Sequence, residues 1–411
     1  MQAVTLEPAR IRSAWEGRIS GCMLGKPVEV LSFQQGRTGL AAYLREADAL
    51  PLRDYVPLIE GTVVARLGRA CCRGHMVRAE PDDDINYTML ALLLLEDLGV
   101  AFETADVARA WLHLLPAGAT WTAERAAYRT LFCNMADEFV NGEEAGFDLA
   151  ECSDNQYNEW IGAQIRADLY GWVCPGRPAL AAELARRDAS LSHRGESVYA
   201  AAFIAALGAA IPATGSLDRA TDAALEQIPA DSEAAAAVIF GRNLANEPHA
   251  VERLHRRYEE LSPVHTLNNL ALVVWALHAA DGDFGTAIGD AVAAGWDTDC
   301  NGATVGGLFG LTGAEIPDSW TRPWAGRIGI GLAGISELQL DEVVARTVAV
   351  AETIIGDQHV QHKRKRLAAA HNRAAGNNDN RGMCGCGALR STYRIPGTKG
   401  HGCACRRWHC R

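Results

Sequence analysis

Two runs of aspartates are the residues of this sequence best suited to chemistry. Asp82, Asp83 and Asp84 follow Pro81 and stand directly before an apolar run of helical length. One aspartate there would be an ordinary helix cap, because its carboxylate accepts hydrogen bonds from free backbone N–H groups. Three successive carboxylates repel one another, so the excess charge indicates either a solvated acidic surface or a hard cation such as Mg²⁺.

A second acidic helix entrance contains Asp297 and Asp299, followed by Cys300 and a run of small residues. Side chains two positions apart in an irregular turn can point to one centre. Two such entrances in a helical protein resemble the halves of a dinuclear site, in which ions roughly 3.5 to 4 Å apart hold a substrate and activate a water. The pair of clusters therefore predicts a metal-assisted hydrolase.

The elements that must position these clusters read as helices. Runs rich in alanine and leucine have helical length at residues 86–98, 177–187, 197–211, 220–227, 267–278 and 338–355. Gly99 and Pro212 are predicted to end two of these helices. Strand signals are almost absent, so we predict an all-α fold, a compact single-domain helical bundle over residues 1–360.

Glycines four residues apart recur in the chain. Because glycine weakens a helix interior by about 1 kcal/mol relative to alanine, such repetition indicates either close helix crossing or loops. Neighbouring apolar residues at helical spacing favour close crossing. The series are Gly17, Gly21 and Gly25; Gly302, Gly306 and Gly310; and, more loosely, residues 326–334.

Charge divides the chain near residue 360. Residues 1–360 carry 27 Lys and Arg against 49 Asp and Glu, whereas residues 361–411 carry 12 against the single acid Asp379. The acidic body disfavours nucleic-acid binding and suits metal binding. The basic tail contains Cys384, Cys386, Cys403 and Cys405, whose spacing is irregular for zinc, and its composition predicts disorder.

The apolar runs, the N-terminus and the cysteines of the sequence bear on the cellular compartment of the protein. No apolar run was found to reach the roughly 18 to 20 residues that span a bilayer, and the N-terminus lacks the order of a signal peptide. The seven cysteines of the body follow no disulfide framework, which indicates buried thiols in a reducing compartment. We expect a cytoplasmic protein with no membrane partner.

Four segments together resemble the ADP-ribosylglycohydrolase family, which includes dinitrogenase-reductase-activating glycohydrolases, ADP-ribosyl-acceptor hydrolases and crystallin J1 relatives. The resemblance covers about residues 10–355 and is carried by residues 17–29 (GRISGCMLGKPVE), 82–89 (DDDINYTM), 192–199 (SHRGESVY) and 295–310 (GWDTDCNGATVGGLFG). It implies an all-α fold with two Mg²⁺ ions that cleaves the bond between C1 of a ribose and its acceptor. The implied substrate is a small molecule or an ADP-ribosylated protein.

The resemblance and the residue pattern together give candidate roles to individual residues. The catalytic candidates are Glu29, Asp83 and Asp299. The metal-ligand candidates are Asp82, Asp83, Asp84, Asp297, Asp299 and Cys300. The substrate-binding candidates are Ser192, His193 and Gly195, joined by Asn268 and Asn269, two amides on an apolar run that either reach the cleft or cap a helix.

Some positions depart from the family's pattern. Asp82 precedes the first aspartate pair, where relatives usually have Thr or Ser, and Ile85 follows it, where they usually have Thr. Cys300 follows the second pair, where relatives usually have Thr or Ser. Lys26 stands where many relatives have an acidic Gly-Asp-Ala sequence. A thiol is a poor ligand for a hard ion, so the ligand set is expected to be redistributed, with Mn²⁺ as an alternative to Mg²⁺. The alternatives to a glycohydrolase are a family member that binds ADP-ribose or a nucleotide with weak turnover, and a dinuclear phosphohydrolase.

Overall fold

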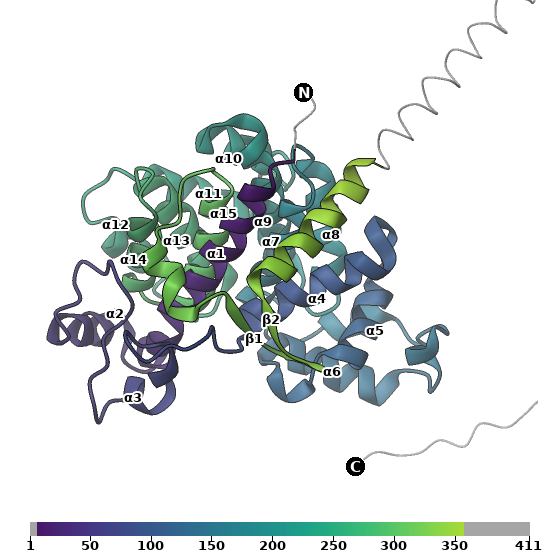
Figure 1. The fold of residues 1–411 in the computed structure, drawn as a ribbon. Helices are drawn as coiled ribbons and strands as arrows, with labels where there is room; N and C mark the ends of the chain where they lie inside the picture. Colours follow the sequence, from purple (N-terminus) through teal and green to yellow (C-terminus); the bar gives the residue numbers. More distant parts are fainter. Residues whose placement is uncertain (1–5, 357–411) are drawn as a thin grey trace, which may run out of the picture. The chain divides into compact units, whose positions relative to one another are not determined.

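Helices make up nearly all of the regular structure in the computed structural model, which describes residues 6–356 (Figure 1). The predicted all-α fold is confirmed, while the predicted boundary at residue 360 and the basic tail at 361–411 lie outside the described residues. The helices are α1 (Pro8–Gly25), α2 (Glu29–Glu46), α3 (Val63–Leu67), α4 (Asp83–Leu98), α5 (Thr104–Leu114), α6 (Thr122–Asn134), α7 (Asp168–Trp172), α8 (Pro178–Ala189), α9 (Gly195–Thr214), α10 (Leu217–Leu225), α11 (Glu233–Asn243), α12 (Ala250–Arg257), α13 (Thr266–Ala279), α14 (Phe284–Ala293), α15 (Thr298–Gly310) and α16 (Asp318–Thr321). A further helical segment covers residues 340–356.

Helix α4 begins and ends where its sequence predicts. Asp82 is the N-cap, and its side chain accepts a hydrogen bond from the backbone N–H of Asp84 at 3.0 Å. At the other end Gly99 has φ +60°, a left-handed conformation that glycine adopts without steric cost. Capping by Asp82 therefore accounts for one of the three successive aspartates.

Helix α9 corrects two expectations. It continues through Pro212 to Thr214 and ends at Gly215 with φ +59°, because a proline in the last turn removes only one helical N–H donor. By length and composition this 20-residue helix could also cross a membrane, so the apolar run was longer than expected. However, 72% of its most apolar window is buried inside the protein. Within the described residues, α9 is a core helix that packs against α8, α10 and α7.

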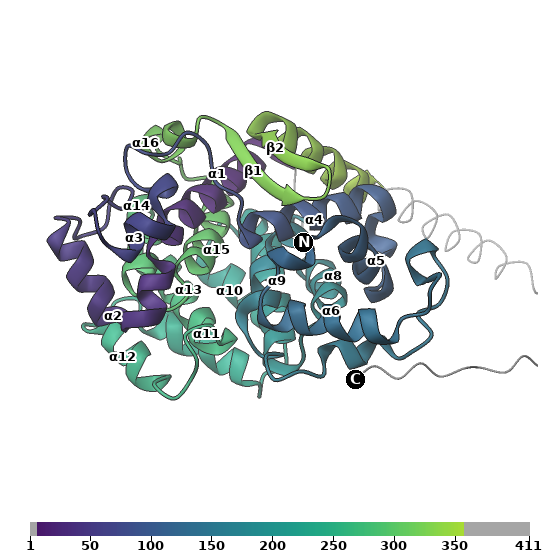
Figure 2. The ribbon, with the colours of Figure 1, turned by 90° about the horizontal axis from the view of Figure 1, so that it is seen from below.

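Helices α1 and α15 lie side by side through the centre of the fold (Figure 1 and Figure 2). A Cβ added at Gly17 or Gly21 would overlap with the carbonyl oxygen of Gly306 or Gly302, respectively. The two regular glycine series therefore mark a close helix crossing, as predicted. This crossing places the carboxyl end of α1 beside the first turn of α15.

The looser glycine series at 326–334 is not a helix crossing. It forms an antiparallel hairpin of β1 (Arg327–Leu332) and β2 (Ile335–Gln339), the one sheet among the described residues, which lies beside α4 (Figure 2). The sequence RIGIGL alternates with period two, which suits a strand. Gly331 donates its N–H to the Asn86 side chain of α4 at 2.7 Å, so the hairpin is fastened to the helix that carries the first aspartates.

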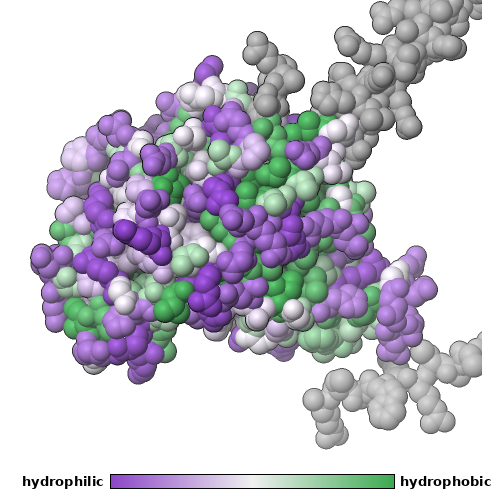
Figure 3. All heavy atoms as spheres, in the orientation of Figure 1, coloured by the Kyte–Doolittle hydropathy of each residue, from purple (hydrophilic) through white to green (hydrophobic). Residues whose placement is uncertain are grey.

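The surface and the core separate by polarity. Hydrophilic residues cover much of the face shown in Figure 3, with hydrophobic residues gathered in smaller patches between them. All seven cysteines of the described residues are free; six are buried and Cys133 is exposed. The expectation of buried thiols without disulfides thus holds for six of these seven residues.

Candidate active site

The first aspartate cluster is held by two cations of the N-terminal segment. Arg18 of α1 is fully buried and contacts Asp84 Oδ1 at 3.2 Å and Asp168 Oδ2 at 3.0 Å. Lys26, in the short 3₁₀ helix Lys26–Val28 that follows α1, contacts Asp82 Oδ2 through its Nζ. Helix α1 and the residue that follows it therefore supply counter-charges to the aspartates of α4, and the backbone of α1 packs against α15.

The second cluster is oriented by an amide network. Asp297 precedes α15 and follows Trp296, whose φ is +61°. Asn269 of α13 accepts hydrogen bonds at its Oδ1 from Asn301 Nδ2 at 2.7 Å and from the Asp297 backbone N–H at 3.4 Å. Its own amide donates to the carbonyls of Pro263 and His265, each at 2.8 Å. Asn269 thus fixes the turn that carries Asp297.

The α1–α15 crossing brings the two clusters together. Ligand-capable atoms lie within 4.8 Å of one another in three groups: Cys22, Asp82 and Asp84; Asp84, Asp299 and Cys300; and Glu29, Asp297 and Asp299. Asp84 and Asp299 each belong to two of these groups, so the clusters form one continuous set. Asp83 belongs to none of the three groups and instead lines the neighbouring cleft.

Burial and mutual repulsion raise the pKa of most of these carboxyl groups. Burial, followed by neighbouring acids, raises the pKa of Glu29, Asp83 and Asp297 well above their usual values. For Asp299 the same causes raise the pKa to about 6. Such a cluster is costly while ionised unless a cation compensates it.

Two buried carboxylate oxygens are free to bind such a cation. Asp84 Oδ2 and Asp297 Oδ1 have no hydrogen-bond partner, although their residues are 0% and 4% exposed. Buried carboxylate oxygens are expected to be paired or to bind a metal. The described carboxylates therefore fit a bound metal ion, and the donor set is mainly hard oxygen with the thiols of Cys22 and Cys300 at its edges.

The carboxylate cluster opens onto a cleft of about 560 Å³. Acidic, aromatic and small apolar side chains share its wall, and the acidic and tryptophan residues among them are Glu29, Asp83, Glu124, Asp297, Trp121 and Trp160. Trp121 is exposed, whereas Glu124 is 3% exposed. The cleft thus joins a carboxylate floor to aromatic walls, which is an arrangement that suits a small organic ligand.

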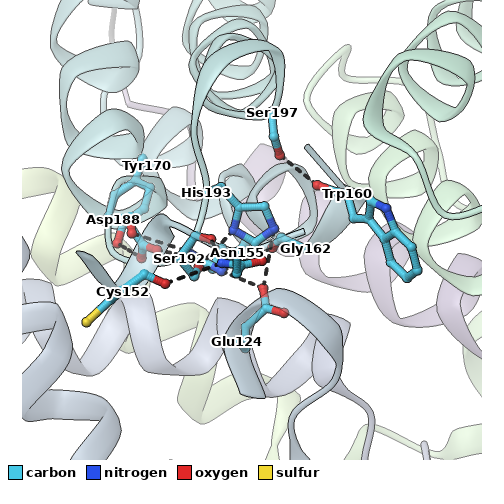
Figure 4. Close-up of polar contacts among 11 residues, drawn as sticks. Glu124, Cys152, Asn155, Trp160, Gly162, Tyr170, Asp188, Ser192, His193 and Ser197 are labelled. Atoms are coloured by element: carbon cyan, nitrogen blue, oxygen red, sulfur yellow. Dashed lines mark hydrogen bonds and ion pairs between the residues drawn. The ribbon is translucent and has the colours of Figure 1, made fainter. Parts of the chain in front are cut away.

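The predicted substrate-binding residues Ser192 and His193 lie in a buried network beside this cleft (Figure 4). Ser192 Oγ contacts His193 Nδ1 at 2.8 Å, and His193 Nε2 lies 3.8 Å from Glu124 Oε1. Arg166 donates to Glu124 Oε1 at 2.8 Å and to Ser192 Oγ at 3.0 Å. His193 is 1% exposed and reaches the cleft through Glu124, so its predicted contact with substrate stays a prediction.

The remaining predicted binding residues, Gly195, Asn268 and Asn269, are also absent from the lining of the cleft. Gly195 opens α9 with φ +53°, a conformation that disfavours other residues. Asn268 and Asn269 are fully buried in the first turn of α13. Asn268 donates to Ser262 O at 3.3 Å, and the segment 262–264 lines the cleft. The two amides therefore shape the cleft from behind its wall.

Sequence reasoning missed the residues that link these parts. Glu124 looks like a surface acid in the first turn of an amphipathic helix, and Arg166 lies in an irregular segment. Trp121 and Trp160 lie far apart in sequence and share no motif. Lys26 was visible as a departure from a pattern, but its contact with Asp82 depends on the three-dimensional fold.

Comparisons with known proteins bear on the family and the fold of this chain. The family model described as ADP-ribosylglycohydrolase matches residues 3–353. None of the curated proteins matches the chain. Among solved structures the chain is similar to one titled "ADP-ribosylglycohydrolase-related protein complex", with 20% sequence identity and a TM-score of 0.51 over 84% of this chain and 98% of that chain. The structural likeness supports the fold, and the family model extends over both aspartate clusters and the helices that join them, so the chain belongs to the ADP-ribosylglycohydrolase family.

Proposed function

We propose that this protein is a Mg²⁺-dependent hydrolase that cleaves an N- or O-glycosidic bond to ribose. ADP-ribose attached to a protein or small-molecule acceptor is the first substrate to test, because the chain belongs to a glycohydrolase family. The observation that carries the proposal is the carboxylate cluster, which contains unpartnered buried oxygens and opens onto a cleft with aromatic walls.

Glu29, Asp297 and Asp299 would hold the ion, with Asp84 as a neighbouring ligand. When bound, Mg²⁺ would supply a Lewis acid that orients the ribose hydroxyls and lowers the pKa of a water. Mn²⁺ prefers similar oxygen ligands and is the alternative ion. Arg18 restrains Asp84 from the opposite side, so this carboxylate is positioned before any ion arrives.

Asp83 is the carboxylate that we assign as general base. It lines the cleft, belongs to none of the three ligand groups, and its pKa is raised by burial and by Asp82. Asp83 takes a proton from a water while that water's oxygen forms a bond to C1 of the ribose. The bond from C1 to the acceptor breaks, the acceptor leaves with the electron pair, and the proton held by Asp83 passes to it.

The aromatic walls would bind the part of the substrate that is remote from the reacting bond. Trp121 and Trp160 offer ring faces and edges to a planar or apolar group. Binding energy gathered there orients C1 against the carboxylates. A substrate that lacks this remote group is therefore expected to lose turnover.

The proposed setting is the cytoplasm. The seven cysteines among the described residues are all free, which a reducing compartment allows.

A release assay tests the proposal. The purified full chain is incubated with ADP-ribosylated protein and with small ribosyl glycosides, in Mg²⁺, in Mn²⁺ and in EDTA, and the products are separated by chromatography. We expect metal-dependent release of ADP-ribose or ribose, and much slower release from Asp83→Asn. Release of inorganic phosphate would instead support a phosphohydrolase, and saturable binding without release would support a binding protein.

A further inference from the structure

Lys26 contacts Asp82, which belongs to one of the three ligand groups. Its Nζ contacts Asp82 Oδ2, while Asp82 Oδ1 accepts the hydrogen bond from the backbone N–H of Asp84 at 3.0 Å. Both oxygens of Asp82 are therefore engaged by groups of this chain. Asp82 is 6% exposed, so water does not replace these partners.

Two carboxylates of the cluster differ from Asp82 in this respect. Asp84 Oδ2 and Asp297 Oδ1 are buried and have no partner. Lys26 also acts electrostatically on Glu29, Asp83 and Asp299, so its charge is felt across the cluster. The positive charge of Lys26 thus lies at Asp82, whereas the carboxylate oxygens without a partner belong to Asp84 and Asp297.

The three ligand groups are unequal for the same reason. Lys26 engages the group of Cys22, Asp82 and Asp84, and the group of Asp84, Asp299 and Cys300 contains a thiol. The group of Glu29, Asp297 and Asp299 consists of carboxylates alone, which suits a hard divalent ion.

We propose that Lys26 is a tethered cation that removes Asp82 from the ligand set, so that the cluster binds one divalent ion centred on Asp299 instead of two. The inference rests on the proposed metal-dependent function. It assigns to a side chain of this protein the place that a second ion would take.

Counting bound Mn²⁺ tests the inference without any substrate. The full chain is equilibrated with Mn²⁺, and free ion is measured by electron paramagnetic resonance. We expect one ion per chain in the wild type, two in Lys26→Met, and one in Lys26→Arg, which keeps the charge. Asp82→Asn should still bind one ion, and the double variant Lys26→Met with Asp82→Asn should return to one.

The other possible results distinguish a failure of the inference on Lys26 from a failure of the proposed metal-dependent function. Two ions in both the wild type and Lys26→Met, or one in both, overturns the inference and leaves metal-dependent hydrolysis standing. No ion in the wild type but one in Lys26→Met supports displacement by Lys26 and contradicts the metal-dependent function. No ion in either overturns both. If Lys26→Met does not fold, loss of the ion in Asp82→Asn would still overturn the inference, because Asp82 would then be a ligand.

Discussion

Gly21 of α1 and Gly302 of α15 meet backbone to backbone, so closely that a Cβ on either would overlap with the carbonyl oxygen of the other. This contact aligns the end of α1, which leads to Glu29, with the helix entrance that carries Asp299. Helix spacing at this point therefore sets the spacing between the two halves of the carboxylate cluster.

The first prediction concerns this crossing. Gly21→Ala should lower the free energy of unfolding by about 1 to 3 kcal/mol, because the backbones must separate to admit a methyl group. Urea unfolding measures the loss. The matched control is Gly118→Ala, where an added Cβ meets no atom within 4 Å. Equal stability of the two variants would contradict the close crossing.

The second prediction separates a metal ligand from a base. At a Mg²⁺ concentration of about 100 times Kd, binding adds about 2.7 kcal/mol to the free energy of unfolding. Asp299→Asn should remove most of this gain, measured as the Mg²⁺-induced shift in melting temperature. Asp83→Asn should keep the shift and reduce turnover by roughly 10² to 10⁴-fold.

Exposed Asp231 supplies the control for these variants, since Asp231→Asn should change neither the melting shift nor turnover. A full Mg²⁺ shift in Asp299→Asn would argue against a shared metal centre. Loss of the shift in Asp83→Asn would make Asp83 a ligand and reassign the base.

The third prediction concerns Cys300. Its thiol lies within 4.8 Å of carboxylate oxygens of Asp84 and Asp299, and burial, followed by nearby acids, raises its pKa well above the usual value. A protonated thiol is a poor ligand for Mg²⁺, whereas a hydroxyl oxygen is a hard donor. Cys300→Ser should tighten Mg²⁺ binding, measured by calorimetry, and activity should hold or rise.

The exposed thiol of Cys133 provides the comparison, because Cys133→Ser should leave Mg²⁺ affinity unchanged. If Cys300→Ser abolished activity at unchanged Mg²⁺ affinity, the thiol would have a chemical role and the mechanism proposed above would have to be abandoned.

The fourth prediction concerns pH. Burial, followed by Arg166, lowers the pKa of His193 well below its usual value, so the imidazole is neutral in the folded state. In the unfolded chain it takes up a proton below about pH 6.5, so its contribution to stability is present above that pH and is lost as pH falls. The loss amounts to at most about 1.4 kcal/mol per pH unit.

Urea unfolding at pH 7, 6 and 5 would measure this slope. His193→Gln should be less steep than the wild type below about pH 6.5, whereas His75→Gln, at an exposed site, should match the wild type. Identical slopes for the wild type and His193→Gln would show that His193 can be protonated in the folded protein.

Much of the fold, and the residues at the centre of the candidate site, could be predicted from local sequence. Asp82 before an apolar run predicted the N-cap of α4, and the spacing of Gly17 and Gly21 predicted a close helix crossing without naming the partner helix. The cap is readable because it depends on residues within one turn of chain, and the glycines are readable because they recur at helical spacing within their own helix; the partner helix is not readable in this way. The resemblance to a family predicted that Asp84 and Asp299 share one centre, and their ligand-capable atoms do lie within 4.8 Å of one another.

What could not be predicted depends on contacts between distant segments. Glu124 and Arg166 pair across 42 positions of sequence, and Lys26 and Asp82 across 56. The hairpin at 327–339 was missed because glycines can serve a strand, a loop or a helix crossing, and the strand pairing and the contact with Asn86 appear only in the fold. Long-range pairing of this kind leaves no periodic signal in the chain.

Thr298 donates its hydroxyl to the carbonyl of Gly25 at 2.9 Å, across 273 positions of sequence. On the ribosome, the aspartates at the start of α4 emerge long before the residues of α15 that complete their cluster. A chain arrested before α15 holds three adjacent aspartates with Arg18 and Lys26 as counter-charges, but it lacks Asp297 and Asp299. The order of synthesis therefore makes the carboxylate centre one of the last parts of the fold to assemble, and its formation reports that nearly the whole domain has been made.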